Sequence, residues 1–255
     1  MATYLVTGAS RGLGLELAAQ LAASPSSEVS LVFTTSRDIS ACGLIGLVKK
    51  FPGRVVPVQL DPGDPESLRA AVALVDDRLR GRGLDVLINN SGVQPITPGK
   101  IEMAYVDDLT EVFHTNVTMT HLVTRAFLPL LRQGSRKVIT NISSTLGSIF
   151  LSTRFLSSPA HAYKISKAAM NMMTVQYALQ YANEGFTVFA VSPGWLRTDM
   201  GGQDADLPVE TGAVQVLKYV KNGGKELNGR FLNIHVPGWE NAPGPNQYPG
   251  GNAPW

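Results

Sequence analysis

Short apolar runs alternate with longer segments in which apolar residues recur at helical spacing. The runs are rich in Val, Ile and Phe, which favours buried strands, and the longer segments favour amphipathic helices. This alternation predicts β-α-β units with right-handed crossovers, and so one α/β domain with a doubly wound parallel sheet of about seven strands and helices on both faces. The predicted strands are residues 4–6, 29–33, 55–59, 86–88, 137–141, 187–191 and 231–234, and the predicted helices are residues 13–23, 39–50, 65–80, 107–132, 163–183 and 208–219.

Two segments interrupt this rhythm. Residues 145–162 are longer than a usual strand-to-helix connection, and residues 236–255 are rich in Pro, Gly and Asn. Such a fold binds ligands beyond the carboxyl ends of its strands, and residues 145–162 leave one of those ends. Within a single domain covering residues 1–255, we therefore expect residues 145–162 and 195–255 to contribute loops to a substrate pocket.

The composition argues against several classes of function. With 44% hydrophobic and 16% charged residues, the chain suits a folded domain, and a net charge of +2 without a dense Lys/Arg block predicts no nucleic-acid partner. The strand predicted at residues 4–6 leaves no room for a signal peptide, and no apolar run is long enough for a bilayer, so we expect no membrane partner. The one cysteine, Cys42, cannot form an internal disulfide and fits a reducing, cytoplasmic setting.

Two histidines are candidate metal ligands. His114 and His121 lie two helical turns apart and could share a helix face. No carboxylate or third histidine is evidently placed with them, so we expect no metal site.

A glycine-rich turn follows the first predicted strand and opens a helix, in the order Thr7-Gly8-Ala9-Ser10-Arg11-Gly12-Leu13-Gly14. Gly8 permits a tight turn, Gly12 lets a pyrophosphate approach the backbone, and Gly14 lets the helix pack close to the sheet. The helix N-terminus offers free N–H groups to phosphates. The position of the turn favours a dinucleotide site over a purely structural turn.

This spacing resembles the Thr-Gly-x-x-x-Gly-x-Gly form of the short-chain dehydrogenases/reductases, a family with a single-domain Rossmann fold. The resemblance spans nearly the whole chain and is closest to C-factor and sniffer-like carbonyl reductases and fungal norsolorinic acid ketoreductase-like enzymes. The shared passages are Pro193-Gly194-Trp195, residues 198–202, residues 229–233 and the closing Pro254-Trp255.

The nicotinamide cofactor predicted is NADP(H). The second strand runs into Ser36-Arg37, where an NAD-selective site carries an acid for the ribose hydroxyls. Arg37 and Arg11 could instead hold a 2′-phosphate through charge-assisted hydrogen bonds. A small shift in register would make Asp38 the ribose acid, so NAD stays an alternative. The family resemblance adds three further cofactor contacts: Asp61 at the adenine, and Asn90 and Gly92 in an Asn-Asn-Ala-Gly-like segment where Ser91 replaces Ala.

Tyr163 and Lys167 are four residues apart on a predicted helix, which puts them on one face. A free phenol has a pKa near ~10, and we expect the Lys167 ammonium and an oxidised nicotinamide ring to lower the pKa of Tyr163. By resemblance, Tyr163 donates the proton, Ser144 hydrogen-bonds the carbonyl oxygen, Lys167 binds the nicotinamide ribose, and Asn116 holds a water that links Lys167 to solvent. Ser143 is the competing serine. The turn after the sixth strand, by resemblance, packs on the nicotinamide through Pro193, Gly194, Trp195 and Thr198.

The resemblance implies an NADPH-dependent reductase of a ketone or aldehyde carbonyl, with a small-molecule carbonyl substrate. It also implies a homodimer or homotetramer, because the helix with Tyr163 often forms a dimer face in this family. A non-redox step on the same fold (dehydration, rearrangement or cyclisation) and a nucleotide-binding regulator are the alternatives. Several large apolar residues suggest a bulky apolar or aromatic substrate, although core or interface packing explains some of them equally well: Leu146, Ile149, Phe150, Phe155, Leu156, Trp195, Met200 and Trp239.

Overall fold

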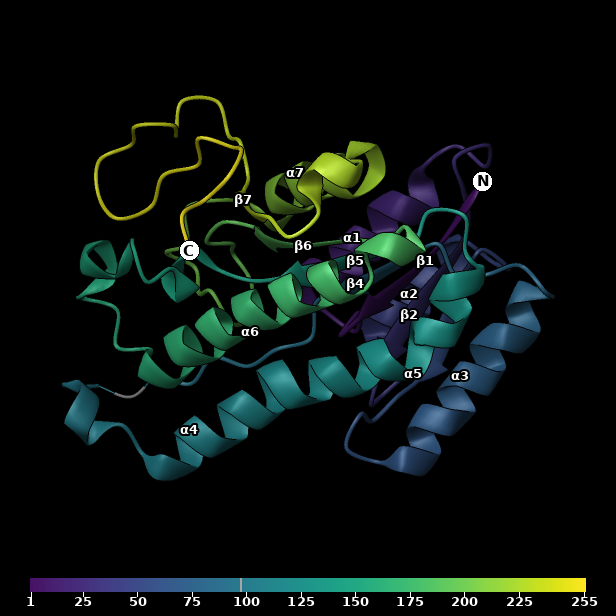
Figure 1. The fold of residues 1–255 in the computed structure, drawn as a ribbon, viewed down its shortest axis with the longest axis horizontal. Coiled ribbons are helices and arrows are strands. Elements are labelled where there is room, and N and C mark those ends of the chain that lie inside the picture. The colour runs from purple at the N-terminus through teal and green to yellow at the C-terminus, as the bar shows by residue number, and fades with distance from the viewer. Residues whose placement is uncertain (97) are drawn as a thin grey trace.

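The structure of the protein, a computed structural model, describes residues 1–96 and 98–255 (Figure 1). Parallel strands form one sheet in the order β3-β2-β1-β4-β5-β6-β7, with helices on both faces. This confirms the predicted single-domain α/β fold. The strands are β1 (Ala2–Thr7), β2 (Val29–Ser36), β3 (Val55–Gln59), β4 (Val86–Asn89), β5 (Val138–Ile142), β6 (Thr187–Ser192) and β7 (Phe231–Asn233). The helices are α1 (Gly12–Ala23), α2 (Cys42–Lys50), α3 (Pro65–Leu79), α4 (Val106–Phe113), α5 (Met119–Gln133), α6 (His161–Gln180) and α7 (Val209–Asn222).

Each face of the sheet carries an apolar core. Helices α1, α2 and α7 cover one face, and α3, α5 and α6 contribute to the core on the other. Successive residues of β1 alternate between them: Tyr4 and Val6 belong to the first core and Leu5 to the second. Strands buried on both faces need apolar residues at every position, which explains the continuous apolar runs in the sequence. Among the residues described, no helix combines the length and apolar character that crossing a membrane requires.

Among the differences from the predicted bounds, three affect the elements around the site. Strand β2 continues to Ser36, so Arg37 follows it directly. Helix α2 begins at Cys42 rather than at residue 39, because the Asp38 carboxylate accepts hydrogen bonds from the Ser40 N–H (2.8 Å) and hydroxyl (2.5 Å), which holds a turn there. The helix predicted over residues 107–132 is interrupted by a π-helical stretch, His114–Thr118, between α4 and α5.

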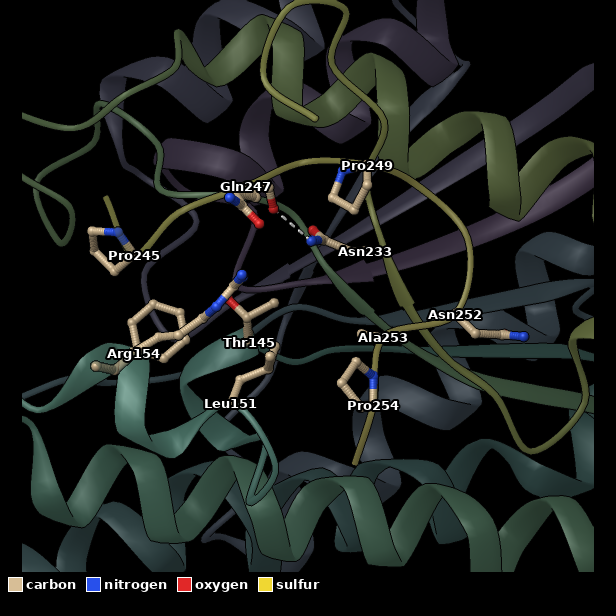
Figure 2. Close-up of a pocket in the computed structure, with 11 residues that line it drawn as sticks. Thr145, Leu151, Arg154, Asn233, Pro245, Gln247, Pro249, Asn252, Ala253 and Pro254 are labelled. Atoms are coloured by element: carbon tan, nitrogen blue, oxygen red, sulfur yellow. Dashed lines mark hydrogen bonds between the residues drawn. The ribbon is translucent and has the colours of Figure 1, made fainter. Parts of the chain in front are cut away.

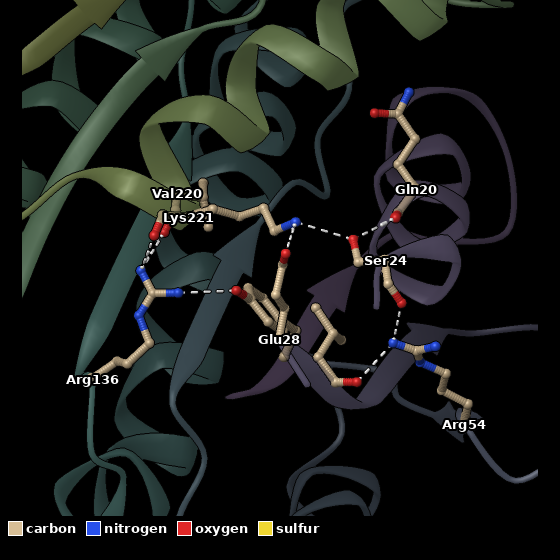
Figure 3. A network of polar contacts seen from close by, with 9 residues as sticks. Gln20, Ser24, Glu28, Arg54, Arg136, Val220 and Lys221 are labelled. Atoms are coloured by element: carbon tan, nitrogen blue, oxygen red, sulfur yellow. Dashed lines mark hydrogen bonds and ion pairs between the residues drawn. The ribbon is translucent and has the colours of Figure 1, made fainter. Parts of the chain in front are cut away.

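A polar network joins the amino ends of the strands to the last turns of α1 and α7 (Figure 3). The Arg136 guanidinium donates to the Tyr4 hydroxyl at 3.0 Å and to the carbonyls of Val220 and Lys221 at 2.7 and 2.9 Å. The Lys221 ammonium reaches Glu28 at 2.8 Å. The Arg136 guanidinium thus provides hydrogen-bond donors for carbonyls in the last turn of α7. Together the contacts hold the edge of the sheet that lies opposite the candidate site.

At the other edge, a buried polar ladder runs beneath the strand ends. The Asn89 amide donates to Asn141 Oδ1 at 2.8 Å and to the Thr124 hydroxyl at 2.9 Å, and the Asn141 amide donates to the Thr174 hydroxyl at 2.8 Å. All of these side chains are buried. Because a buried polar group is costly without a partner, this ladder fixes the register of β4, β5 and α6 just below the site.

Candidate active site

The carboxyl ends of the strands open into a cleft of about 950 Å³. It lies where the strand order reverses between β1 and β4, the usual ligand position in a doubly wound sheet. Two predicted residues, Gly14 and Asn116, pack behind its lining. The other predicted site residues line it: Gly8, Ser10, Arg11, Gly12, Leu13, Arg37, Asp61, Asn90, Gly92, Ser144, Tyr163, Lys167, Pro193, Gly194, Trp195 and Thr198.

The glycine turn between β1 and α1 depends on its missing side chains. Gly8 and Gly12 have φ of 64° and 55°, a left-handed conformation that favours glycine. A Cβ on Gly14 would lie 2.4 Å from the Gly8 carbonyl oxygen, so a side chain there would push α1 away from the sheet. A Cβ on Gly12 would meet the Thr198 side chain at 3.5 Å across the cleft. The turn therefore presents bare backbone to the cleft at Gly12.

Asn90 joins the glycine turn to the end of β4. Its amide donates to the carbonyls of Thr7 (2.9 Å) and Gly8 (3.3 Å), and the Thr7 hydroxyl accepts from the N–H groups of Asn90 and Ser91. The Ser91 hydroxyl oxygen would lie 2.8 Å from a Cβ on Gly8, so Ser91 packs against the turn. The substitution of Ser for Ala at this position therefore fits between two elements that the fold already holds together.

Ser144, Tyr163 and Lys167 converge on the cleft. Ser144 lies two residues after the end of β5 and lines the cleft, where its hydroxyl is hydrogen-bonded to that of Tyr163. Lys167, one turn later on α6, places its Nζ 5.3 Å from the centroid of the Tyr163 ring and donates to the Ile142 carbonyl at 2.7 Å. Both side chains are almost fully buried, with Tyr163 8% and Lys167 3% exposed. The arrangement puts two hydroxyls and an amine at one point of the cleft wall.

Burial dominates the electrostatics of this group. It raises the pKa of Tyr163 to about 12, against the lowering effect of the Ser144 hydrogen bond, and it lowers the pKa of Lys167 to about 7. The protein alone therefore does not produce the lowered Tyr163 pKa that the sequence suggested. The physical reason is that removal from water disfavours both charged forms, the phenolate as much as the ammonium. Tyr163 consequently carries its proton at neutral pH.

Asn116 lies in the π-helical stretch and is fully buried. Its Oδ1 accepts from the Val93 N–H at 2.8 Å, and its amide donates to the Val93 carbonyl and to the Ser166 hydroxyl, both at 3.0 Å. These bonds tie the segment after β4 to α6, next to Lys167. A π-helical turn at such a point commonly marks a functional position.

The two candidate serines have different neighbours. The Ser143 hydroxyl is buried and donates to Asn171 Oδ1 at 2.6 Å, inside the protein. Ser144 faces Tyr163, as preferred from the sequence. Gly147 helps to place it: a Cβ there would lie 2.6 Å from the Lys167 Cβ, so only glycine lets this turn pack directly on α6.

The turn after β6 is held in place by Tyr248, a residue of the C-terminal tail. Gly194 has φ of 87°, and the Trp195 N–H donates to the Tyr248 hydroxyl at 3.1 Å. That hydroxyl in turn donates to Asp206, and burial together with Asp206 raises the pKa of Tyr248. Tyr248 is a supporting residue that the sequence analysis did not identify, because it lies in the irregular tail without a motif around it.

Charged side chains lie at two places along the cleft, one after β2 and one beside the glycine turn. Arg37 and Asp38 line the cleft after β2, and hydrogen bonds from Ser40 lower the pKa of the Asp38 carboxyl. Arg11 Nη1 forms an ion pair with Asp199 Oδ2 at 2.7 Å, which bridges the glycine turn and the segment after β6. Both partners are more than 70% exposed, at 76% and 73%, so this pair adds little to stability.

The apolar residues proposed for the substrate end fall into three groups. Leu146, Phe155, Trp195 and Met200 line the cleft. Ile149, Phe150 and Leu156 are exposed to solvent at 76%, 75% and 81%. Trp239 instead packs against Tyr248 with the two rings tilted, at 5.5 Å between ring centroids.

The fold and the cleft define an α/β protein with a dinucleotide-binding architecture. The model of the short chain dehydrogenase family matches residues 2–207. The chain therefore belongs to the short-chain dehydrogenase family, and the resemblance found in the sequence is confirmed.

Similar proteins include several with defined names. An NADPH-bound carbonyl reductase from chicken fatty liver has a TM-score of 0.84 and 36% identity, covering 91% of each chain. The carbonyl reductase Sniffer of D. melanogaster has a TM-score of 0.84 and 30% identity, covering 91% of this chain and 96% of that one. A short-chain dehydrogenase of Penicillium roqueforti, anuI, is 30% identical over 90% of this chain and 92% of its own length.

Proposed function

We propose that this protein is an NADPH-dependent reductase that converts the ketone or aldehyde carbonyl of a small, bulky apolar or aromatic substrate to an alcohol, with Tyr163 as proton donor. The observation that carries the proposal is the convergence of the Ser144 and Tyr163 hydroxyls with buried Lys167 in the wall of the cleft. The similarity to carbonyl reductases, one of them bound to NADPH, supports the same reaction.

The residues of the cleft fit a nicotinamide dinucleotide. No side chain covers the backbone at Gly12, and a Cβ there would take up space in the cleft. Arg11, at the start of α1, makes no side-chain cap, so the first N–H groups of that helix are available to a pyrophosphate. Asp61, Asn90 and Gly92 line the adenine and ribose side by this proposal, and residues 193–198 the nicotinamide side. When bound, the reduced nicotinamide supplies a hydride to the carbonyl carbon.

The protein's own residues manage the proton and the oxygen. Tyr163 holds its proton at neutral pH, and donates it to the carbonyl oxygen as that oxygen gains negative charge. The Ser144 hydroxyl hydrogen-bonds the same oxygen and stabilises its developing charge. Lys167, with its pKa near the ambient pH, returns a proton to the Tyr163 phenolate, and Asn116 positions the segment beside it. The carbonyl thus gains one hydride and one proton.

Cofactor selectivity is proposed to depend on Arg37. Arg37 and Asp38 both line the cleft, and Asp38, the competing ribose acid, already accepts two hydrogen bonds from Ser40. Replacing Arg37 with Ser is expected to raise KM for NADPH by about 10- to 100-fold, the value of one charge-assisted contact, with little change in KM for NADH. Initial rates with both cofactors measure this. Equal changes for both would contradict the assignment of Arg37 to the 2′-phosphate.

A direct assay tests the proposed function. Purified protein is incubated with NADPH and a panel of aromatic and alicyclic ketones, and the loss of NADPH absorbance is compared with alcohol formation by chromatography. We expect one alcohol formed for each NADPH consumed. Conversion of a substrate without nucleotide consumption would instead indicate the non-redox alternative.

The expected homodimer or homotetramer stays a prediction. Helix α6 leaves Ile165, Met172 and Leu179 exposed at 47%, 61% and 70%, spaced seven residues apart on one side. We propose this side as the contact between copies. Light scattering would refute the proposal if the protein stayed monomeric at micromolar concentration.

A further inference from the structure

The tail after β7 folds back along that strand. Antiparallel bridges join Leu232 to Asn252 and His235 to Pro249. Because β7 is the last strand of the sheet, this pairing satisfies backbone groups that an edge strand otherwise leaves without partners. The tail is therefore fixed to the edge of the sheet until shortly before its last residues.

Those last residues leave β7 and cross to the segment after β5. The Ser148 hydroxyl donates to the Pro254 carbonyl at 2.7 Å, and the Phe150 N–H donates to the main-chain oxygen of Trp255 at 2.9 Å. The Trp255 ring stacks on the buried Phe231 ring, with the centroids 5.5 Å apart and the planes at 26°. Trp255 thus joins two elements, because its ring packs on β7 and its backbone binds the segment after β5.

The middle of that segment is held by its backbone and by a hydroxyl group. Ile149 and Phe150 point into solvent, at 76% and 75% exposed, so their side chains do not anchor it. The buried Ser148 hydroxyl also accepts from the Leu151 N–H at 3.1 Å, so one group serves both this turn and the bond to Pro254. A pocket of about 100 Å³ lies between the segment and the tail (Figure 2). The position of residues 148–151 therefore depends on a few hydrogen bonds to the tail.

The same segment forms a wall of the substrate end of the cleft. It begins directly after Ser144 and includes Phe155, which is 5% exposed and lines the cleft. Its start is packed on α6 at Gly147, and near its end the Lys164 ammonium donates to the carbonyls of Phe155 and Ser158 at 2.6 and 2.7 Å. The contact with the tail falls between these two points. It therefore fixes the part of the wall that leads into Phe155.

We propose that Trp255 is a positioning residue of the substrate site, which holds the wall containing Phe155 in the shape that a bulky ring requires. A wall that is ordered before the substrate arrives improves binding, because ordering a loop during binding costs free energy. A small ketone covers less of the wall and depends on it less. This inference rests on the proposed reductase function and adds a residue that determines its preference for large substrates.

The first test does not depend on activity. Arg154 is exposed and is followed by buried Phe155, so trypsin cuts between them fastest when the segment opens. We expect Trp255→Ala to speed this cleavage by about 10-fold, the effect of losing a packed ring pair. Trp255→Phe keeps a ring on Phe231 and should stay near the wild-type rate. Mass spectrometry identifies the fragments, and cleavage at other Lys and Arg residues is the internal reference.

The second test measures selectivity with NADPH and two ketones, α-tetralone and cyclohexanone. In Trp255→Ala we expect KM for tetralone to rise by about 10-fold, while KM for cyclohexanone, kcat and the Kd for NADPH change by about twofold or less. Trp255→Phe should restore the KM for tetralone. Ser148→Ala removes the bond to Pro254 and should act in the same direction. Because both variants weaken one contact, their effects in the double variant should be less than additive.

Tyr181→Ala is the matched control. Tyr181 is also a partly exposed ring packed on a buried one, that of Phe186, at 5.6 Å between centroids, and it lies outside the residues that line the cleft. This variant should lower the melting temperature as Trp255→Ala does, and should keep both KM values and the cleavage rate after Arg154. The comparison separates a local effect on the wall from a general loss of stability.

The outcomes distinguish this inference from the proposed function. If the wild-type protein reduces no ketone with NADPH, the proposed function fails and takes the positioning role with it. If ketones are reduced but Trp255→Ala keeps the wild-type KM for tetralone, raises both KM values equally, or is cleaved after Arg154 no faster than wild type, the positioning role is refuted and the reductase function stands.

Discussion

Phenylalanine in place of Tyr163 is expected to lower kcat for ketone reduction by about 10²- to 10⁴-fold, the range that a positioned general acid contributes. The ring would stay in its buried place on α6, but the proton for the carbonyl oxygen and the hydrogen bond to Ser144 would both be lost. Steady-state kinetics measure the effect, with NADPH affinity determined alongside to separate loss of chemistry from loss of cofactor.

Tyr177→Phe provides the matched control. Tyr177 lies on the same helix and bonds His121 at 2.8 Å, away from the residues that line the cleft. This variant is expected to keep near wild-type kcat. Full turnover by Tyr163→Phe would show that the proton comes from another group, and equal losses in both variants would point to a general effect on α6.

Methionine in place of Lys167 is expected to abolish most activity and also to change how stability depends on pH. Burial lowers the pKa of Lys167 to about 7 in the folded protein, whereas the unfolded chain holds that proton up to about pH 10. Between these values the unfolded state binds more protons, so the free energy of unfolding rises with pH, by up to about 1.4 kcal/mol per pH unit. Below the folded pKa the full cost of burying the ammonium is present.

Lys167→Met removes this slope. Compared with the variant, wild-type protein without cofactor should gain about 1 to 2 kcal/mol of stability between roughly pH 7 and 9, measured by denaturant unfolding. The absolute difference is less informative, because methionine leaves the Ile142 carbonyl without its donor. Lys218→Met, at an exposed position of α7, should keep the wild-type slope. An identical slope in wild type and Lys167→Met would contradict the depressed pKa.

The sequence predicted the fold because the strands are buried on both faces and the helices on one. Those environments demand continuous apolar runs such as residues 4–6 and amphipathic segments such as residues 65–80. The cleft residues were predictable for a related reason, since Gly12, Ser144 and Tyr163 each follow a strand end or begin a helix at a position that the topology brings to one edge.

Features that depend on contacts between distant segments were not predictable. The π-helical stretch at His114–Thr118 contains neither Gly nor Pro, so nothing local marks it, and it is accompanied by the contacts of Asn116 with Val93 and Ser166. The raised pKa of Tyr163 in the protein without cofactor was not predictable either, because the pattern of residues gives charges and not the extent of burial. The contact of Trp255 with Phe150 arises only when the tail folds back to the segment after β5.

The most direct measurement of the proposed reaction follows the transferred hydrogen. A ketone substrate is converted with NADPH that carries deuterium at its transferable position, and the product alcohol is analysed by mass spectrometry and NMR. Hydride transfer predicts one deuterium on the carbinol carbon of each product molecule and none on its oxygen after exchange with water. A product formed without deuterium on that carbon would contradict the assignment of this protein as a carbonyl reductase.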